Sequence, residues 1–151
     1  IGVFDAHWLR PLAQVLKELG ATKVMIVHSE DGLDEISIAA RTQFAELSDG
    51  QIRTGAITPS SFDIRGGSIS DLKVDGPLQS LSLIRAALNN VNGPARDIVV
   101  LNAAAAIYVA GLAPDFKSGV DLARDTIANG NAAQKLEELA AYSSSFRGET
   151  A

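Results

Sequence analysis

The sequence has no cysteine, few aromatic residues and no long hydrophobic segment. Without cysteine the chain has no disulfide framework, iron–sulfur cluster, thiol nucleophile or cysteine-bound zinc. Aromatic residues make up only 5%, so the core has to be built from Ala, Val, Ile and Leu. No aliphatic run approaches the ~18 residues of a membrane span, and no basic signal-peptide segment opens the chain. We therefore expect a cytoplasmic protein with no membrane partner.

Positive charge is also scarce. Thirteen Lys and Arg residues face 18 Asp and Glu residues, which gives a net charge of −5. No Lys/Arg cluster is present to grip a phosphate backbone, so nucleic acid is not an expected partner. A hydrophobic share of 46% excludes intrinsic disorder. The length of 151 residues fits one domain.

Strand-like segments recur along the chain. Two continuous aliphatic segments, 23–28 and 97–101, predict buried strands, the first covered on both faces. Segments 41–47 and 51–57 flank the turn residues Ser48-Asp49-Gly50 and predict an antiparallel hairpin. A further short strand is expected at the very start, over residues 1–4. The start inside a structural element, without an initiator Met, leads us to expect a segment of a longer protein.

Helical patterns separate these strands. Leu9, Leu12, Leu16 and Leu19 share one helical face, which predicts a helix that packs on the sheet. Capping residues and glycines predict the helix ends, and the expected helices lie between Asp5 and Gly20, from Pro77 to about Val91, from Asn102 to Gly111, from Asp115 to Gly130, and around residues 132–142. Residues 58–76 are expected to be a long irregular loop. Together these elements predict an α/β domain over residues 1–142, with a mixed β-sheet flanked by helices and a frayed tail over 143–151.

The densest polar cluster follows the first buried strand and consists of Glu30, Asp31, Asp34 and Glu35. Ligands of open α/β sheets bind outside the carboxyl ends of the strands. Neighbouring Asp34 and Glu35 are candidate Mg²⁺ ligands, since Mg²⁺ takes one or two carboxylates together with waters and substrate phosphates. The alternative interpretation is a solvated acidic loop.

The remaining candidates are weaker. His28 ends the same strand and is either a general base, a metal ligand or a hydrogen-bonded structural residue; His7 is a still weaker candidate. The nucleophile elbow G-x-S-x-G, the P-loop and the dinucleotide motif G-x-G-x-x-G are all absent. Gly66-Gly67 is therefore interpreted as a turn. The residues by themselves lead to an α/β domain with a candidate magnesium site.

Four of these segments, in this order and spacing, resemble the anthranilate phosphoribosyltransferase family. They are GVFDAHWLRPLAQVLKELG, VMIVHSEDGLDEIS, RDIVVLNAAAAIYVAG and GVDLARDTIANGNAAQKLEEL. The resemblance extends to about Leu139 and matches only the C-terminal part of the family's chain. One departure is Ser29, where the family usually has Gly.

The resemblance implies the α/β domain of the nucleoside phosphorylase/phosphoribosyltransferase fold. It implies transfer of phosphoribose from phosphoribosyl pyrophosphate to anthranilate, in tryptophan biosynthesis, by a magnesium-dependent homodimer. Asp34 and Glu35 match the family's magnesium-binding Asp-Glu pair. The family's helical domain, glycine-rich diphosphate loop and anthranilate-contacting residues belong to parts that this sequence does not match, so catalytic and substrate-binding residues stay unassigned. The segment alone is expected to be inactive.

Three alternatives stay open at this point. The first is a nucleic-acid-binding relative without transferase activity, against which the net charge of −5 argues. The second is a nucleoside phosphorylase-like enzyme with another acceptor. The third is a non-catalytic fragment that is stable by itself.

Overall fold

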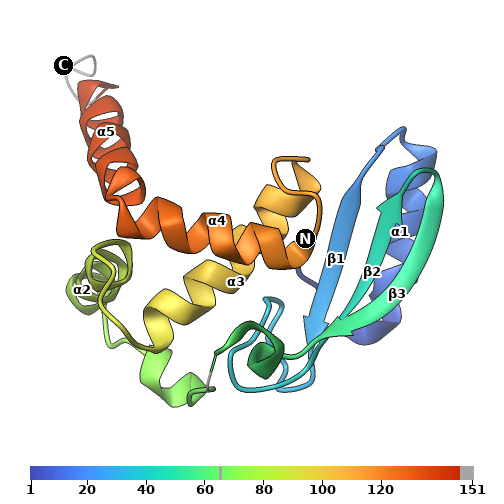
Figure 1. Ribbon diagram of the computed structural model, residues 1–151, viewed down its shortest axis with the longest axis horizontal. Helices are drawn as coiled ribbons and strands as arrows, with labels where there is room; N and C mark the ends of the chain where they lie inside the picture. Colours follow the sequence, from blue (N-terminus) through green and yellow to red (C-terminus); the bar gives the residue numbers. More distant parts are fainter. Residues whose placement is uncertain (65, 147–151) are drawn as a thin grey trace.

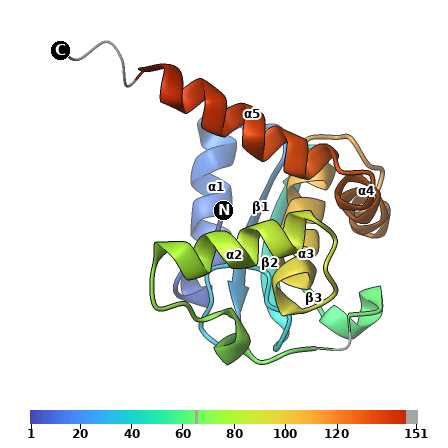
Figure 2. The ribbon, with the colours of Figure 1, turned by 90° about the vertical axis from the view of Figure 1, so that its left-hand side faces the viewer.

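In the computed structural model, which describes residues 1–64 and 66–146, a three-stranded antiparallel sheet lies between helices (Figures 1 and 2). Helix α1 covers one face of the sheet, whereas α3 crosses the other face and packs against α4. The strands are β1 (Val24–Ser29), β2 (Thr42–Ser48) and β3 (Gln51–Ile57), and the helices are α1 (Leu9–Glu18), α2 (Pro77–Leu88), α3 (Pro94–Val109), α4 (Phe116–Ala128) and α5 (Asn131–Ser145).

The sheet confirms the predicted hairpin and the α/β fold class. Asp49 and Gly50 connect β2 to β3 with φ angles of 50° and 71°, as a tight hairpin turn requires. The three strands are antiparallel, and the sheet is mixed because Gly2, at the start of the chain, forms a parallel bridge with Val27. There the Val3 N–H donates to the Val27 carbonyl at 2.9 Å. The expected strand over residues 1–4 is thus a single bridge.

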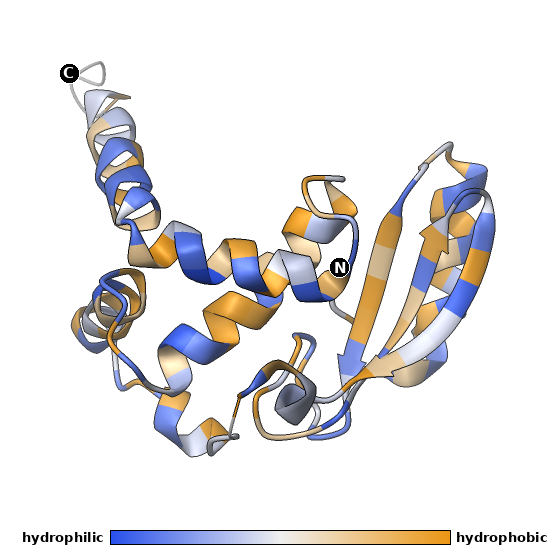
Figure 3. Cartoon of the chain, viewed as in Figure 1, coloured by the Kyte–Doolittle hydropathy of each residue, from blue (hydrophilic) through white to orange (hydrophobic). Residues whose placement is uncertain are grey.

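Strand β1 is covered on both faces, as its aliphatic run predicted. Ile26 points toward α1 and belongs to a cluster with Leu9 and Ala13. Met25 and Val27 point the other way and belong to a larger cluster to which α3 and α4 contribute. The orange colouring of β1 and of the middle of α3 shows this apolar interface (Figure 3). Two separate cores therefore hold β1 in place.

The prediction of a buried strand over 97–101 is wrong, because these residues lie inside α3. Pro94 begins this helix, and its apolar run continues directly into the alanines at 103–106. A helix that is apolar on most sides is buried between other elements, and it lacks the one-sided spacing that distinguishes helix from strand. The β-branched run was outweighed by the tertiary packing of the whole segment.

The small-residue segment of α3 packs closely on α4. A Cβ on Gly119 would lie 2.8 Å from the Ala104 carbonyl oxygen, so the two helix backbones nearly touch. Val120, Ala123 and Ile127 of α4 are buried in the same apolar cluster.

Several boundaries differ from the predictions. Leu19 is 77% exposed, because α1 ends at Glu18 and the chain turns away from the sheet at Gly20. The segment 58–76 is not wholly irregular, since it contains the short 3-10 helices Pro59–Phe62 and Ile69–Leu72. Helix α5 continues past the expected end at residue 142 to Ser145, and residues 147–151 of the expected tail lie outside the described part.

The caps predicted at Asp5 and Asp115 are confirmed. Asp5 accepts a hydrogen bond from the His7 N–H at 2.8 Å and begins the short helix that leads into α1. Asp115 accepts one from the Ser118 N–H at 2.7 Å and begins α4. Within the described ranges, no helix is both long and apolar enough to cross a membrane.

Candidate functional site

The acidic segment lies between β1 and β2, at the carboxyl end of β1 and next to α3. A tight turn leaves β1: the Ser29 N–H donates to the Leu33 carbonyl, and the Gly32 N–H to the Ser29 carbonyl, each at 2.9 Å. Ser29, where the resembling family usually has Gly, is fully buried as the last residue of the strand. This turn does not require a glycine at Ser29, because the positive φ of 91° belongs to Gly32.

Two of the four carboxylates are used to hold the segment together. Glu30 forms an ion pair with Arg41 at 2.9 Å, across the segment's two ends. Asp31 accepts the Ser37 hydroxyl at 2.6 Å and the Leu33 N–H at 3.3 Å. Both side chains therefore have structural partners within the protein.

The protonation of Asp31 reflects these contacts. Partial burial by itself would raise its pKa. The hydrogen bonds from the Ser37 and Ser29 side chains and from the Leu33 N–H overcome this effect and hold the pKa of Asp31 below its usual value. Asp31 is thus a charged anchor of the turn.

The other two carboxylates have no such partner. Asp34 and Glu35 are exposed, and within residues 1–64 and 66–146 neither carboxylate forms a hydrogen bond or an ion pair. The same described residues contain no group of three His, Asp or Glu side chains that would hold a metal by themselves. Two adjacent free carboxylates nevertheless fit Mg²⁺, which takes one or two of them and completes its shell with water and phosphate oxygens.

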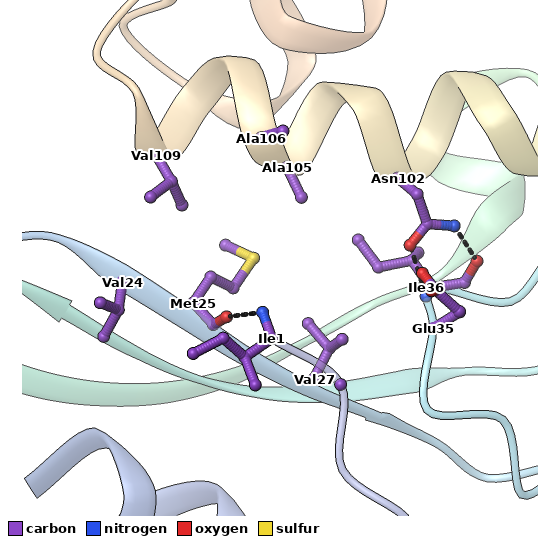
Figure 4. A pocket seen from close by; sticks show the side chains of 11 residues that line it. Ile1, Val24, Met25, Val27, Glu35, Ile36, Asn102, Ala105, Ala106 and Val109 are labelled. Carbon is purple, nitrogen blue, oxygen red and sulfur yellow. Dashed lines mark hydrogen bonds between the residues drawn. The ribbon is translucent and has the colours of Figure 1, made fainter. Parts of the chain in front are cut away.

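The backbone beneath this pair is held by two contacts. Asn102 of α3 accepts the Ile36 N–H and donates to the Ile36 carbonyl, each at 2.9 Å (Figure 4). Gly2 also lies so close to this backbone that a Cβ there would be 1.5 Å from the Asp34 carbonyl oxygen. The two free carboxylates therefore project from a clamped backbone.

Beside Glu35 lies a cavity of about 310 Å³ between β1 and α3. Apolar side chains from both elements face it, among them Met25 and Val27 from β1 and Ala105 and Val109 from α3 (Figure 4). Glu35 and Asn102 contribute its polar rim.

The two histidines take no part in this pair. His28 is half-buried, and its Nδ1 lies 2.9 Å from the Val3 carbonyl oxygen, to which only a protonated Nδ1 can donate. This contact supports the structural interpretation of His28. His7 is exposed and stacks edge-on against Trp8, with ring centroids 5.2 Å apart. Gly66, with a φ of 84°, fits the expected turn.

The sequence interpretation missed the roles of Asn102 and Gly2. Asn102 was expected to cap a helix, but it lies inside α3, and its amide contacts Ile36. The two residues are separated by 66 positions, so no local spacing links them. The one available signal was a polar residue inside an otherwise apolar segment.

Known proteins are similar to this chain in both sequence and fold. An anthranilate phosphoribosyltransferase of Thioalkalivibrio sulfidiphilus (strain HL-EbGR7) is 48% identical over 145 residues, which are 96% of this chain and 43% of that protein. The crystal structure of the Thermus thermophilus enzyme superimposes with a TM-score of 0.83 at 37% identity, covering 93% of this chain and 41% of that one. A variant of the Saccharomyces cerevisiae enzyme, solved with Mg bound, gives a TM-score of 0.74 at 25% identity, covering 90% of this chain and 40% of that one.

These similarities confirm the resemblance and the fold. The chain spans about 43% of the length of the curated relative from Thioalkalivibrio. The family model described as "Glycosyl transferase family, a/b domain" matches residues 1–133. The chain therefore belongs to this glycosyl transferase family and carries its a/b domain.

Proposed function

We propose that this chain is the α/β part of an anthranilate phosphoribosyltransferase, with Asp34 and Glu35 as its magnesium ligands. The observation that carries the proposal is the difference within one acidic segment. Glu30 and Asp31 have partners in the protein, whereas the adjacent Asp34 and Glu35 have none within the described residues. Relatives at 48% identity that carry this enzyme name support the assignment.

The arrangement suits a reaction in which diphosphate leaves a sugar. Carboxylates would repel a diphosphate directly, so Asp34 and Glu35 make sense at such a site with a cation between them and the substrate. When bound there, Mg²⁺ would supply positive charge opposite the oxygens of the leaving group. The contacts of the Ile36 backbone fix the point from which both side chains extend, which limits the reorganisation needed at the moment of reaction.

The alternative functions are not favoured. A nucleic-acid-binding relative would need a basic surface, and the net charge is −5. A nucleoside phosphorylase-like enzyme with another acceptor would share the fold, but the relatives described above are transferases that act on anthranilate by name. The homodimer, the cytoplasmic location and the place in tryptophan biosynthesis stay predictions of the resemblance.

A chimeric enzyme tests the proposal. The matching 43% of the Thioalkalivibrio sulfidiphilus protein is replaced by this chain, and the fluorescence of anthranilate is followed in the presence of phosphoribosyl pyrophosphate and Mg²⁺. We expect the chimera to consume anthranilate and the chain alone to leave it unchanged, because catalysis needs substrate and metal held together.

Two outcomes would contradict these expectations. A well-folded chimera that leaves anthranilate unchanged would overturn the proposal. Turnover by the purified chain of 15.8 kDa would instead refute the expectation that the segment is inactive alone.

A further inference from the structure

We infer that Asn102 is a positioning residue for the carboxylates of Asp34 and Glu35. This inference rests on the proposed function, because it takes these two side chains as the metal ligands. Asn102 itself touches neither carboxylate; it contacts the backbone of Ile36, the residue that directly follows Glu35.

The contact uses the whole amide group of Asn102. Its oxygen accepts the Ile36 N–H at 2.9 Å, and its nitrogen donates to the Ile36 carbonyl at 2.9 Å and to the Ile98 carbonyl at 3.0 Å. A side-chain amide that pairs with both polar groups of one residue imitates a neighbouring β-strand. It fixes the position and the direction of the peptide units on both sides of Ile36, one of which Glu35 shares.

The support behind Asn102 is rigid. It lies in the middle of the 16-residue helix α3, between the fully buried Leu101 and Ala104. Ile36 is itself completely buried in the same apolar cluster. The loop that carries the acidic pair is thus tied to a packed helix rather than to another loop.

The other contacts of the acidic segment among the described residues do not serve this role. Glu30 and Asp31 tie the two ends of the segment to each other, through Arg41 and Ser37, but these partners belong to the segment or its edge. Gly2 touches Asp34 through close contact rather than a hydrogen bond. Asn102 supplies the hydrogen bonds that join the backbone next to Glu35 to α3, on one wall of the cavity (Figure 4).

The test measures metal binding by the 151-residue chain itself. Mn²⁺ alone serves as a paramagnetic substitute for Mg²⁺, and its affinity is taken from the broadening of amide NMR signals over residues 33–37. In the wild-type chain we expect broadening centred on Asp34 and Glu35. In Asn102→Ala we expect about tenfold weaker binding, since residues that orient metal ligands typically contribute that much or more.

Two further variants make the result specific. Asn102→Leu removes the same hydrogen bonds but keeps the side-chain volume and favours the helix, so it guards against loss of folding. Tyr108→Phe is the matched control: it also removes a hydrogen bond between α3 and the sheet, to Glu46. Tyr108→Phe should lower thermal stability and leave Mn²⁺ affinity unchanged.

The outcomes separate this inference from the proposed function. Mn²⁺ affinity of Asn102→Leu equal to that of the wild type, with the Ile36 amide now exchanging rapidly, would overturn the positioning role while leaving the metal site intact. Absence of broadening around Asp34 and Glu35 in the wild type would overturn the proposed metal site, and the inference with it. Weaker binding in both Asn102 variants but not in Tyr108→Phe would establish the inference.

Discussion

Among the described residues, polar contacts join α3 to the sheet or its loops around Tyr108 and around Asn102. The two regions differ in whether the neighbouring charged side chains have partners. Near the end of α3, the Tyr108 hydroxyl donates to Glu46 at 2.5 Å, and Lys23 lies over the Tyr108 ring and donates to the Tyr108 carbonyl at 2.7 Å. In the middle of α3, Asn102 holds Ile36 by neutral hydrogen bonds, and the nearby carboxylates of Asp34 and Glu35 stay without partners among the described residues.

The difference indicates which cluster is structural. Around Tyr108 the charged side chains of Glu46 and Lys23 both have partners, because each contacts Tyr108. Beside Asn102, the carboxylates of the sequence neighbours Asp34 and Glu35 are exposed and have no partner among the described residues. The proposed metal site depends on this difference.

The largest effect is expected when the free pair is neutralised. In the chimeric enzyme, Asp34→Asn with Glu35→Gln keeps the side-chain shapes and removes two negative charges. We expect kcat/KM to fall about 100-fold or more, since metal stabilisation of developing charge is worth several kcal/mol. Thermal unfolding of the isolated chain should barely change, because neither carboxylate has a partner to lose.

That prediction fails in a definite way. Wild-type kcat together with wild-type Mg²⁺ dependence in the double variant would remove both residues from the magnesium site. Glu30→Gln in the same chimera is the matched control, because it removes one charge four positions away from Asp34 and should keep most of the activity.

A smaller effect is expected from Gly2→Ala, which acts on the backbone of the acidic segment and not on its carboxylates. Gly2→Ala places a Cβ 1.5 Å from the Asp34 carbonyl oxygen, so either the first residues leave β1 or the acidic segment shifts. We expect a loss of about 1–3 kcal/mol in the free energy of unfolding, typical of overpacking. Denaturant unfolding measures it, and hydrogen exchange of the Val3 amide shows which side moves.

Gly76→Ala is the matched control for this substitution. A Cβ at Gly76 meets nothing within 4 Å, and its φ of 171° is open to any residue. Equal unfolding free energies for the two alanine variants would show that Gly2 does not press on the acidic segment.

The Tyr108 cluster should respond to pH rather than to metal. The hydrogen bond to Glu46, together with burial, raises the pKa of Tyr108 to about 12 from 10.0. The neutral phenol is the stabilising form, so its contribution is complete below pH 10 and is lost as the pH rises toward 12. Tyr108→Phe should lower stability by about 1 kcal/mol at neutral pH, given the partial solvent exposure.

Measurements of stability at alkaline pH distinguish loss of this hydrogen bond from loss of packing. The difference in unfolding free energy between wild type and Tyr108→Phe should shrink between pH 10 and pH 12. A difference that stays constant over this interval would show that the hydroxyl contributes through something other than its bond to Glu46.

The smallest effect is expected at the exposed ion pair of the acidic segment. Arg41 and Glu30 are 54% and 43% exposed in their side chains. Exposed pairs contribute less than about 1 kcal/mol, so Glu30→Gln should shift the unfolding midpoint only slightly, and added salt should reduce the shift further. A loss comparable with that of Gly2→Ala would mean that the pair, rather than the backbone contacts, holds the segment.

Features that depend on neighbouring residues follow from the sequence alone. The hairpin follows from Asp49-Gly50, whose backbone conformation few other pairs adopt. The starts of the short helix before α1 and of α4 follow from the side-chain oxygens of Asp5 and Asp115. The aliphatic run of β1 predicted its burial on both faces. The acidic segment and the choice of Asp34 and Glu35 as candidates came from the same local reasoning.

The remaining features depend on how the elements pack. Residues 97–101 became helix because α3 is enclosed by the sheet and by α4, and an enclosed helix carries no one-sided pattern from which its period can be recognised. The division of four similar carboxylates into two bound and two free depends on Arg41, Ser37 and the fold around them. The contact of Asn102 with Ile36 spans 66 positions, and two residues so distant meet only because the packed core brings α3 against the loop.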